Sequence, residues 1–270
     1  MTSYASMRVA IADGVAEVTL VGPGKGNAMG PDFWRELPQA FAALDTDDAV
    51  RAVVLRGAGQ HFSYGLDLPA MMSQLAPGDH RAADRTRLLD MIAAMQGAVT
   101  QVQACRKPVI AAVSGWCIGG GLDLIAACDV RLCSADARFS LREVRVAMVA
   151  DIGSLQRLPP IIGEGNTREL ALTGKDITAE RALRIGLVNE VLASPAELFE
   201  AAGAMARQIA ENPPLVVQGI KRVMNETQGK SIEEGLRYVA AWNAAFLHSH
   251  DLAEAISAFL EKRAPHYTGH

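Results

Sequence analysis

The stretch that decides the fold is residues 109–123, VIAAVSGWCIGGGLD. It begins with the apolar run Val109–Val113, which predicts a strand buried on both faces. Three glycines follow at positions 119–121, and Leu122–Ala127 predicts the start of a helix. Glycine permits positive φ and lets a ligand approach the backbone, while a helix start leaves N–H groups unpaired. A strand, a tight turn and a helix with free N–H groups are therefore expected here.

A second segment, residues 62–68 (FSYGLDL), has the same order of strand, glycine turn and helix start. Two N–H groups that converge from separate loops can hold a carbonyl oxygen that gains negative charge. Taken singly, each segment is also compatible with an ordinary turn at a helix start. The pair is what suggests an anion-stabilising site.

Outside these segments, strands and helices alternate up to residue 194, and the pattern is helical afterwards. Asp13-Gly14 between two apolar runs predicts a hairpin. The other expected elements are a strand over Ala52–Leu55, a loop over His61–Met72, helices from Pro31 and over Ala82–Ala104, a strand over Val130–Leu132, and helices over Pro195–Glu211, Pro214–Asn225, Ser231–Leu247 and Leu252–Leu260. This order predicts an α/β core at residues 1–194 and an appended helical region at residues 195–270.

Composition narrows the function classes. The chain has 270 residues, of which 50% are hydrophobic and 21% charged, so a large core is possible and global disorder is excluded. A formal net charge of -4 does not suggest a nucleic-acid or anionic-membrane surface. No run approaches the roughly 20 apolar residues of a membrane helix. With no secretory or transit pattern at the N-terminus, we expect a cytoplasmic protein.

Several common cofactor and nucleophile motifs are missing from the sequence. The four cysteines form no Cys-x-x-Cys pair and the six histidines have no zinc spacing, so no metal is expected. Gly22-Pro23-Gly24 starts a dinucleotide-binding pattern, but Asn27 stands where its last glycine would be. No phosphate loop and no G-x-S-x-G nucleophile motif occur.

Three carboxylates are candidates for proton transfer: Asp123, Glu143 and Asp151. Each also has an ordinary explanation, namely helix-dipole complementarity, a surface pair with a neighbouring arginine, and a helix N-cap, respectively. The apolar neighbours of Asp151 favour a desolvated pocket, which would raise its carboxyl pKa and suit it to hold a proton.

Along nearly its whole length the chain resembles the crotonase (enoyl-CoA hydratase/isomerase) superfamily. The most specific pieces are residues 62–68, residues 119–123, Gln156-Arg157-Leu158 with Ile162-Gly163, and Leu172-Thr173-Gly174-Lys175 with Ala182 and Gly186-Leu187-Val188. The resemblance implies an α/β, crotonase-like (ββα)-repeat spiral core with a C-terminal α-helical oligomerisation module.

The resemblance also implies that the N–H groups of Leu66 and Gly120 form an oxyanion hole for an acyl-CoA thioester. It places Asp123 and Glu143 where hydratases of the superfamily carry two catalytic glutamates. Asp123 is one methylene shorter, and Asp151 stands where hydratases usually have a small residue. With these departures the set is more similar to the Δ3,5-Δ2,4-dienoyl-CoA isomerases.

The isomerase hypothesis assigns a role to each acid. Glu143 takes the C2 proton of a 3,5-dienoyl-CoA, Asp151 delivers a proton to C6, and Asp123 orients or tunes Glu143. The reaction would belong to fatty acid β-oxidation. Two alternatives stay open: an enoyl-CoA hydratase that adds water to a 2-enoyl-CoA, and a non-catalytic acyl-CoA-binding protein.

The resemblance further implies how CoA, as part of the substrate rather than a cofactor, is held. The expected contacts are Lys25, Asn27, Ala28, Tyr64, Gly65, Leu66 and Gly120, with Lys262 reaching a CoA phosphate from a neighbouring subunit. The expected assembly is a homotrimer, commonly stacked into a homohexamer, with the C-terminal helices at the contact. No other cofactor, nucleic acid or membrane partner is expected.

Overall fold

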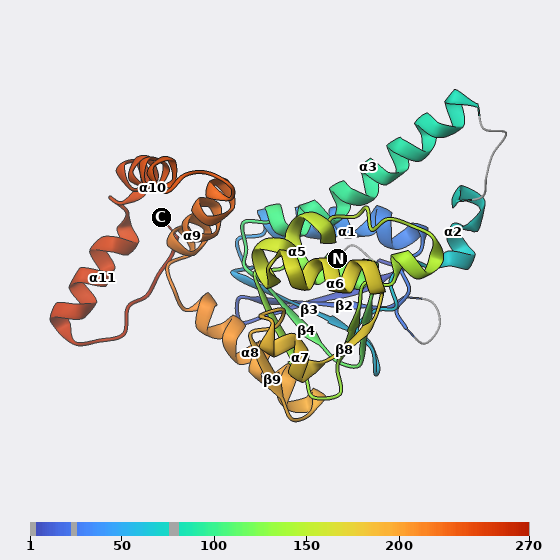
Figure 1. Cartoon of the computed structure of the whole chain (residues 1–270). Coiled ribbons are helices and arrows are strands. Elements are labelled where there is room, and N and C mark those ends of the chain that lie inside the picture. Colours follow the sequence, from blue (N-terminus) through green and yellow to red (C-terminus); the bar gives the residue numbers. More distant parts are fainter. Residues whose placement is uncertain (1–3, 23–25, 76–80, 270) are drawn as a thin grey trace.

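A six-stranded sheet forms the centre of the computed structural model, which describes residues 4–22, 26–75 and 81–269 (Figure 1). Its strand order is β1–β2–β3–β4–β6–β9, and every pairing is parallel except that of β1 with β2. The strands are β1 (Met7–Ala12), β2 (Val15–Leu20), β3 (Ala52–Gly57), β4 (Val109–Val113), β6 (Val130–Ser134) and β9 (Glu190–Leu192). The predicted hairpin is confirmed, with positive φ at both Asp13 and Gly14.

A smaller sheet has the order β5–β7–β8 and carries the site-forming loops. Its strands are β5 (Trp116–Ile118), β7 (Arg138–Ser140) and β8 (Asp176–Thr178). The helices are α1 (Pro31–Thr46), α2 (Leu68–Leu75), α3 (Ala82–Ala104), α4 (Gly120–Ala126), α5 (Ser154–Ile162), α6 (Glu164–Thr173), α7 (Ala179–Arg184), α8 (Pro195–Ala210), α9 (Pro214–Thr227), α10 (Ile232–Phe246) and α11 (His250–Glu261). A 3₁₀ turn covers Glu143–Val146.

The bounds of α3 and β4 are those predicted from sequence, but the predicted loop over His61–Met72 is wrong from Leu68 onward. Helix α2 begins there, and Pro69 lies in its first turn. Proline is compatible with a first helical turn because the N–H it lacks has no partner within the helix at that position. The buried Met71 anchors α2 to the core.

The main sheet has a core on each side. The larger one contains side chains of α1, α3 and α4, and the smaller one is formed where Leu198, Ala202 and Ala206 of α8 pack on the sheet. Small side chains on α8 allow the helix to approach the strands closely. Helix α8 thus packs as part of the core, although it lies in the region predicted as the appended helical part. The predicted boundary between residues 194 and 195 stays a prediction.

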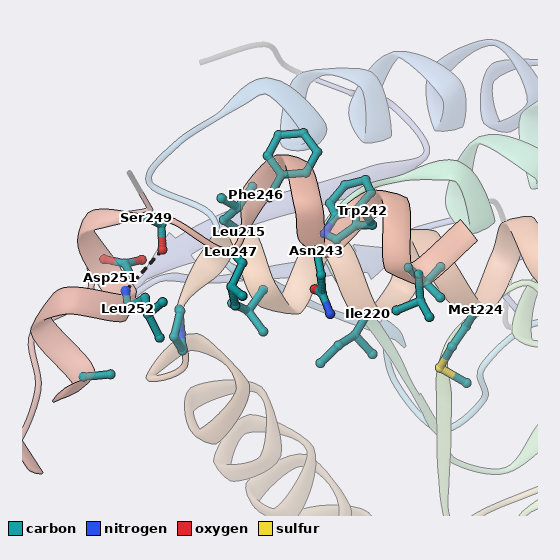
Figure 2. A pocket seen from close by; sticks show the side chains of 16 residues that line it. Leu215, Ile220, Met224, Trp242, Asn243, Phe246, Leu247, Ser249, Asp251 and Leu252 are labelled. Carbon is teal, nitrogen blue, oxygen red and sulfur yellow. Dashed lines mark hydrogen bonds between the residues drawn. The ribbon is translucent and has the colours of Figure 1, made fainter. Parts of the chain in front are cut away.

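Helices α9–α11 lie apart from the sheet, at the opposite end of the molecule from α2 (Figure 1). The buried Lys221 of α9 links them to the core, because its Nζ donates to Asp129 Oδ2 at 2.7 Å and to the Lys107 carbonyl at 3.1 Å. The three helices enclose an apolar cavity of about 380 Å³, along which Figure 2 shows Ile220, Trp242 and Leu252. None of the helices in the described ranges is long and apolar enough to cross a membrane.

Candidate active site

Two backbone N–H groups from separate loops lie side by side next to a large cavity. The segment at residues 62–66 pairs with β5: Ser63 N donates to the Trp116 carbonyl and Ile118 N donates to the Ser63 carbonyl, both at 3.0 Å. A Cβ built on Gly120 would lie 3.8 Å from Leu66 N. Within residues 4–22, 26–75 and 81–269, neither Leu66 N nor Gly120 N donates a hydrogen bond. Both are therefore available to a ligand oxygen.

Glycines make this approach possible. Gly65 (φ +79) and Gly119 (φ +52) have left-handed backbone conformations that other residues rarely adopt. A Cβ on Gly65 would lie 2.6 Å from the Ile118 carbonyl oxygen and 3.0 Å from Gly120 N. The two glycine motifs predicted from sequence are therefore brought together, and side chains at these positions would force them apart.

Asp123 is buried in the first turn of α4 and is held by the next helix. Its Oδ1 accepts the Ser154 N–H at 2.5 Å, at the start of α5, while Oδ2 has no partner among the described atoms. Burial is the main cause that raises the pKa of Asp123 to about 6, against the lowering effect of the Ser154 bond. Sequence offered dipole complementarity within its own helix as the ordinary explanation for Asp123, and the structure adds a hydrogen bond to the N-terminus of α5.

Glu143 begins the 3₁₀ turn and extends toward the glycine loop. Its Oε1 would lie 3.0 Å from a Cβ at Gly119, and its Oε2 is buried with no partner in the described part of the chain. Among the described residues Glu143 forms no ion pair with Arg142 or Arg145, the two neighbours that sequence offered, and Arg142 pairs with Asp176 instead. Burial, reinforced by the negative charges of Asp123 and Asp151, raises the pKa of Glu143 to about 7. Glu143 is thus a base that is half ionised near neutral pH.

Asp151 lies in the turn between the 3₁₀ segment and α5. Ala150 and Ile152 on either side of it are buried, but Asp151 itself is exposed and Val149 is 76% exposed, so the predicted desolvated pocket is formed only in part. The partial desolvation of its carboxyl raises its pKa. It is not the N-cap of α5, because Gly153 occupies that position.

All three acids and both amides border one cavity of about 1090 Å³. Apolar side chains of α2 and α3 form much of the rest of its wall, among them Met72, Leu88, Met91, Ile92 and Met95. The cavity is therefore bordered by backbone N–H groups, which we call the carbonyl end, by carboxyl groups, which we call the acid end, and by apolar side chains. Such an arrangement suits a carbonyl compound with an extended hydrocarbon chain.

Only some of the residues expected to contact CoA border the cavity. Tyr64 borders the cavity, and its ring lies against Gly26, where a Cβ would be 2.2 Å from the ring. Asn27 is buried and its side-chain amide donates to the carbonyls of Ala58, His61 and Phe62, so it shapes the loop from within.

Three more of the expected CoA contacts remain. Ala28 is half-buried in the same loop as Asn27, and Lys25 lies outside the described residues. Lys262 follows α11, a helix that lies at the opposite end of the molecule from α2 (Figure 1). The contact of Lys262 with the CoA of a neighbouring subunit stays a prediction.

Sequence reasoning missed the residues of α3 that contribute to the site. The apolar wall and the contact of Gln96 with the turn of Asp151 come from a helix far away in sequence, and no local pattern indicated them. Among the residues that the structure describes, no group of three or more histidine, cysteine or acidic residues is arranged to hold a metal ion.

The chain is similar in sequence and in fold to known proteins. A family model described as enoyl-CoA hydratase/isomerase matches residues 10–270. The peroxisomal Δ3,5-Δ2,4-dienoyl-CoA isomerase of Arabidopsis thaliana is 46% identical over 91% of this chain and 89% of its own. The mitochondrial enzyme of the same name from Dictyostelium discoideum is 43% identical over 98% of this chain and 92% of its own. An enoyl-CoA hydratase structure from Bacillus anthracis has a TM-score of 0.90 at 29% identity, covering 98% of this chain and 100% of its own.

These relatives also correct the expected location. Their names place them in peroxisomes or mitochondria, which points to an organelle and contradicts the prediction of a cytoplasmic protein. The prediction rested on the lack of a secretory or transit pattern at the N-terminus, and the lack of such a pattern does not determine a compartment.

Proposed function

The chain belongs to the enoyl-CoA hydratase/isomerase family, and from this premise we propose that it converts 3,5-dienoyl-CoA to 2,4-dienoyl-CoA. Membership confirms the resemblance and the crotonase-like α/β fold predicted from sequence, and makes the protein an enzyme of the crotonase superfamily. The observation that carries the proposal is the set Asp123, Glu143 and Asp151 in one cavity wall beside the N–H groups of Leu66 and Gly120.

The reaction begins at the thioester carbonyl. Its oxygen accepts hydrogen bonds from the N–H groups of Leu66 and Gly120, which together form an oxyanion hole. An α-proton can be removed only if the enolate is stabilised, and fixed backbone donors provide this without reorganising. Burial of Gly120 and Gly65 supports the assignment, because a dry site strengthens each hydrogen bond.

Glu143 then accepts the C2 proton. Its raised pKa, about 7, makes it a stronger base than an exposed glutamate while part of it stays ionised at neutral pH. The electron pair left at C2 delocalises over C4 and C6 through the two conjugated double bonds. Asp123, close enough to raise the pKa of Glu143 by its negative charge, tunes the base.

Asp151 completes the reaction by protonating C6, which leaves double bonds at C2 and C4. One proton leaves the substrate and one enters, so the reaction needs no redox partner and no cofactor. Partial desolvation raises the pKa of Asp151 above that of a fully exposed aspartate. Its exposed side allows exchange with water, which returns Glu143 and Asp151 to their starting states between turnovers.

The test offers the purified chain a 3,5-dienoyl-CoA and a 2-enoyl-CoA in parallel. The expected result is growth of 2,4-dienoyl thioester absorbance, with slow or no hydration of the 2-enoyl substrate. Hydration of the second without change in the first would instead make the protein an enoyl-CoA hydratase. Tight acyl-CoA binding without exchange of α-protons for deuterium would make it a non-catalytic binding protein.

We also propose that the protein is a homotrimer, or a hexamer of two stacked trimers, joined through its C-terminal helices, with Lys262 at the CoA phosphate of a neighbour. The apolar surface of these helices supports this, since Ile232, Phe259 and Leu260 are each more than 70% exposed in the single chain. Light scattering of the full chain tests the assembly. A Lys262→Ala variant with an unchanged KM for the CoA thioester would contradict the role of Lys262.

A further inference from the structure

Helix α3 contacts the site with two different faces. Its apolar side chains, including Met91 and Met95, form part of the cavity wall. A polar stripe at Gln96, Thr100 and Gln103 faces the segment that carries Asp151. This spacing of four and three residues places the three side chains on one side of the helix.

The polar stripe holds the main chain at Asp151 and, through Arg157, at the next residue, Ile152. Gln96 Nε2 donates to the Asp151 carbonyl at 2.6 Å. Arg157 donates to the Ile152 carbonyl at 3.2 Å and is itself fixed by Thr100 Oγ1 at 3.0 Å and Gln103 Oε1 at 2.8 Å.

The turn is closed from the other side by Asp123, which accepts the Ser154 N–H. Gln96 is the side chain bonded to residue 151 itself.

The position of Asp151 matters because the intermediate has three carbons that can accept a proton. The dienolate carries negative charge at C2, C4 and C6. Protonation at C2 returns the substrate, protonation at C4 gives a 2,5-dienoyl thioester, and protonation at C6 gives the 2,4-dienoyl product. An acid displaced toward the carbonyl end would therefore produce a different isomer.

We propose that Gln96 is a positioning residue that fixes Asp151 opposite C6 and so excludes protonation at C4. The inference rests on the proposed isomerase function. Because the same helix forms the wall along the hydrocarbon chain, the acid and the chain are placed against one rigid element. The register between Asp151 and the carbon it protonates is then set by α3.

The experiment replaces Gln96 by methionine, which has a similar length but donates no hydrogen bond. Gln101→Met is the matched control, because Gln101 lies on the same helix and its side chain makes no hydrogen bond to any residue described. Both variants receive 3,5-dienoyl-CoA, and the products are separated into 2,4- and 2,5-dienoyl isomers by chromatography and NMR. Exchange of the C2 protons with deuterated water is followed in parallel.

For Gln96→Met we expect a ten- to hundredfold lower rate of 2,4-isomer formation, roughly the loss that a small misplacement of a catalytic group causes. The 2,5-isomer should become a measurable share of the product, while KM and C2 exchange stay at wild-type values. Gln101→Met should behave as wild type. Gln96→Met that forms only the 2,4-isomer at the wild-type rate overturns the inference, and so does an equal loss of exchange and isomerisation. Wild-type protein that forms no 2,4-isomer overturns the proposed function itself.

Discussion

The two ends of the cavity consist of different chemical groups. The carbonyl end consists of main-chain N–H groups at Leu66 and Gly120, fixed by the positive φ of Gly65 and Gly119. The acid end consists of carboxyl side chains whose pKa values are raised by burial. A main-chain donor serves any reaction that passes through an enolate, whereas the side chains decide where protons leave and arrive. Differences between reactions on this scaffold should therefore arise at the acid end.

Removing the base should have the largest effect. In Glu143→Gln the site keeps its shape but loses the group that accepts the C2 proton. We expect isomerisation and C2 deuterium exchange to fall together by about 10³- to 10⁴-fold, the upper range for a general base. Absorbance and NMR measure the two rates, and calorimetry with a substrate analogue checks that thioester binding persists. A variant that retains a tenth of either rate would mean that another group is the base.

Removing the terminal acid should separate the two halves of the reaction. In Asp151→Asn we expect isomerisation to fall about 10²- to 10³-fold, while exchange at C2 persists. Since Glu143 must be ionised to accept a proton and its pKa is about 7, the exchange rate should rise with pH through about 7 and level off above it. Loss of exchange along with isomerisation would show that Asp151 acts in the first step.

The carbonyl end can be changed only by steric means, and we expect a somewhat smaller loss. A Cβ in Gly120→Ala would lie 3.1 Å from Met29 Sδ and 3.8 Å from Leu66 N, so it would crowd the neighbourhood of the second donor. Weakening one donor should lower kcat about a hundredfold and reduce exchange equally. Gly97→Ala on α3, which meets nothing within 4 Å, is the control and should have wild-type activity. Unequal losses of exchange and isomerisation would contradict a shared oxyanion.

Sequence predicted one end of the cavity better than the other, because the residues that form the carbonyl end are neighbours in the chain and those that form the acid end are not. The glycine motifs that place Leu66 and Gly120 are contiguous, so the carbonyl end could be recognised from two short segments. The hairpin and the bounds of α3 likewise depend on neighbouring residues, such as Asp13-Gly14 and Pro108. Helix α2 was missed because its short apolar pattern is joined to a loop and carries Pro69.

The acid end depends on contacts between distant segments. Asp123 bonds to Ser154, 31 residues later, and Gln96 bonds to Asp151, 55 residues later. Such contacts leave no periodicity or spacing in the chain, so sequence named the acids as candidates but assigned their roles only through the resemblance. It gave no indication of the groups that hold them.

The smallest effect on rate is expected from Asp123→Asn, because this change alters the pKa of Glu143 and removes no group that transfers a proton. The asparagine oxygen can still accept the Ser154 N–H, so the change removes charge while keeping the contact. Because the negative charge of Asp123 raises the pKa of Glu143, its removal should move the pH at which C2 exchange begins to lower values. The rate of C2 exchange above pH 8 should change less than the pH at which this exchange begins.

The same substitution should also change how stability depends on pH. Burial raises the pKa of Asp123 to about 6, so the folded state favours the neutral acid. Its contribution to stability is complete below the pKa of the unfolded chain and is lost as pH rises through about 6. Wild-type protein should therefore lose more stability between pH 5 and pH 8 than Asp123→Asn, by a few degrees in Tm. Asp90→Asn, which removes an exposed carboxyl from α3, should follow wild type. If Asp123→Asn also follows wild type, the buried charge at the acid end does not destabilise the fold, and the contrast between the two ends would rest on geometry alone.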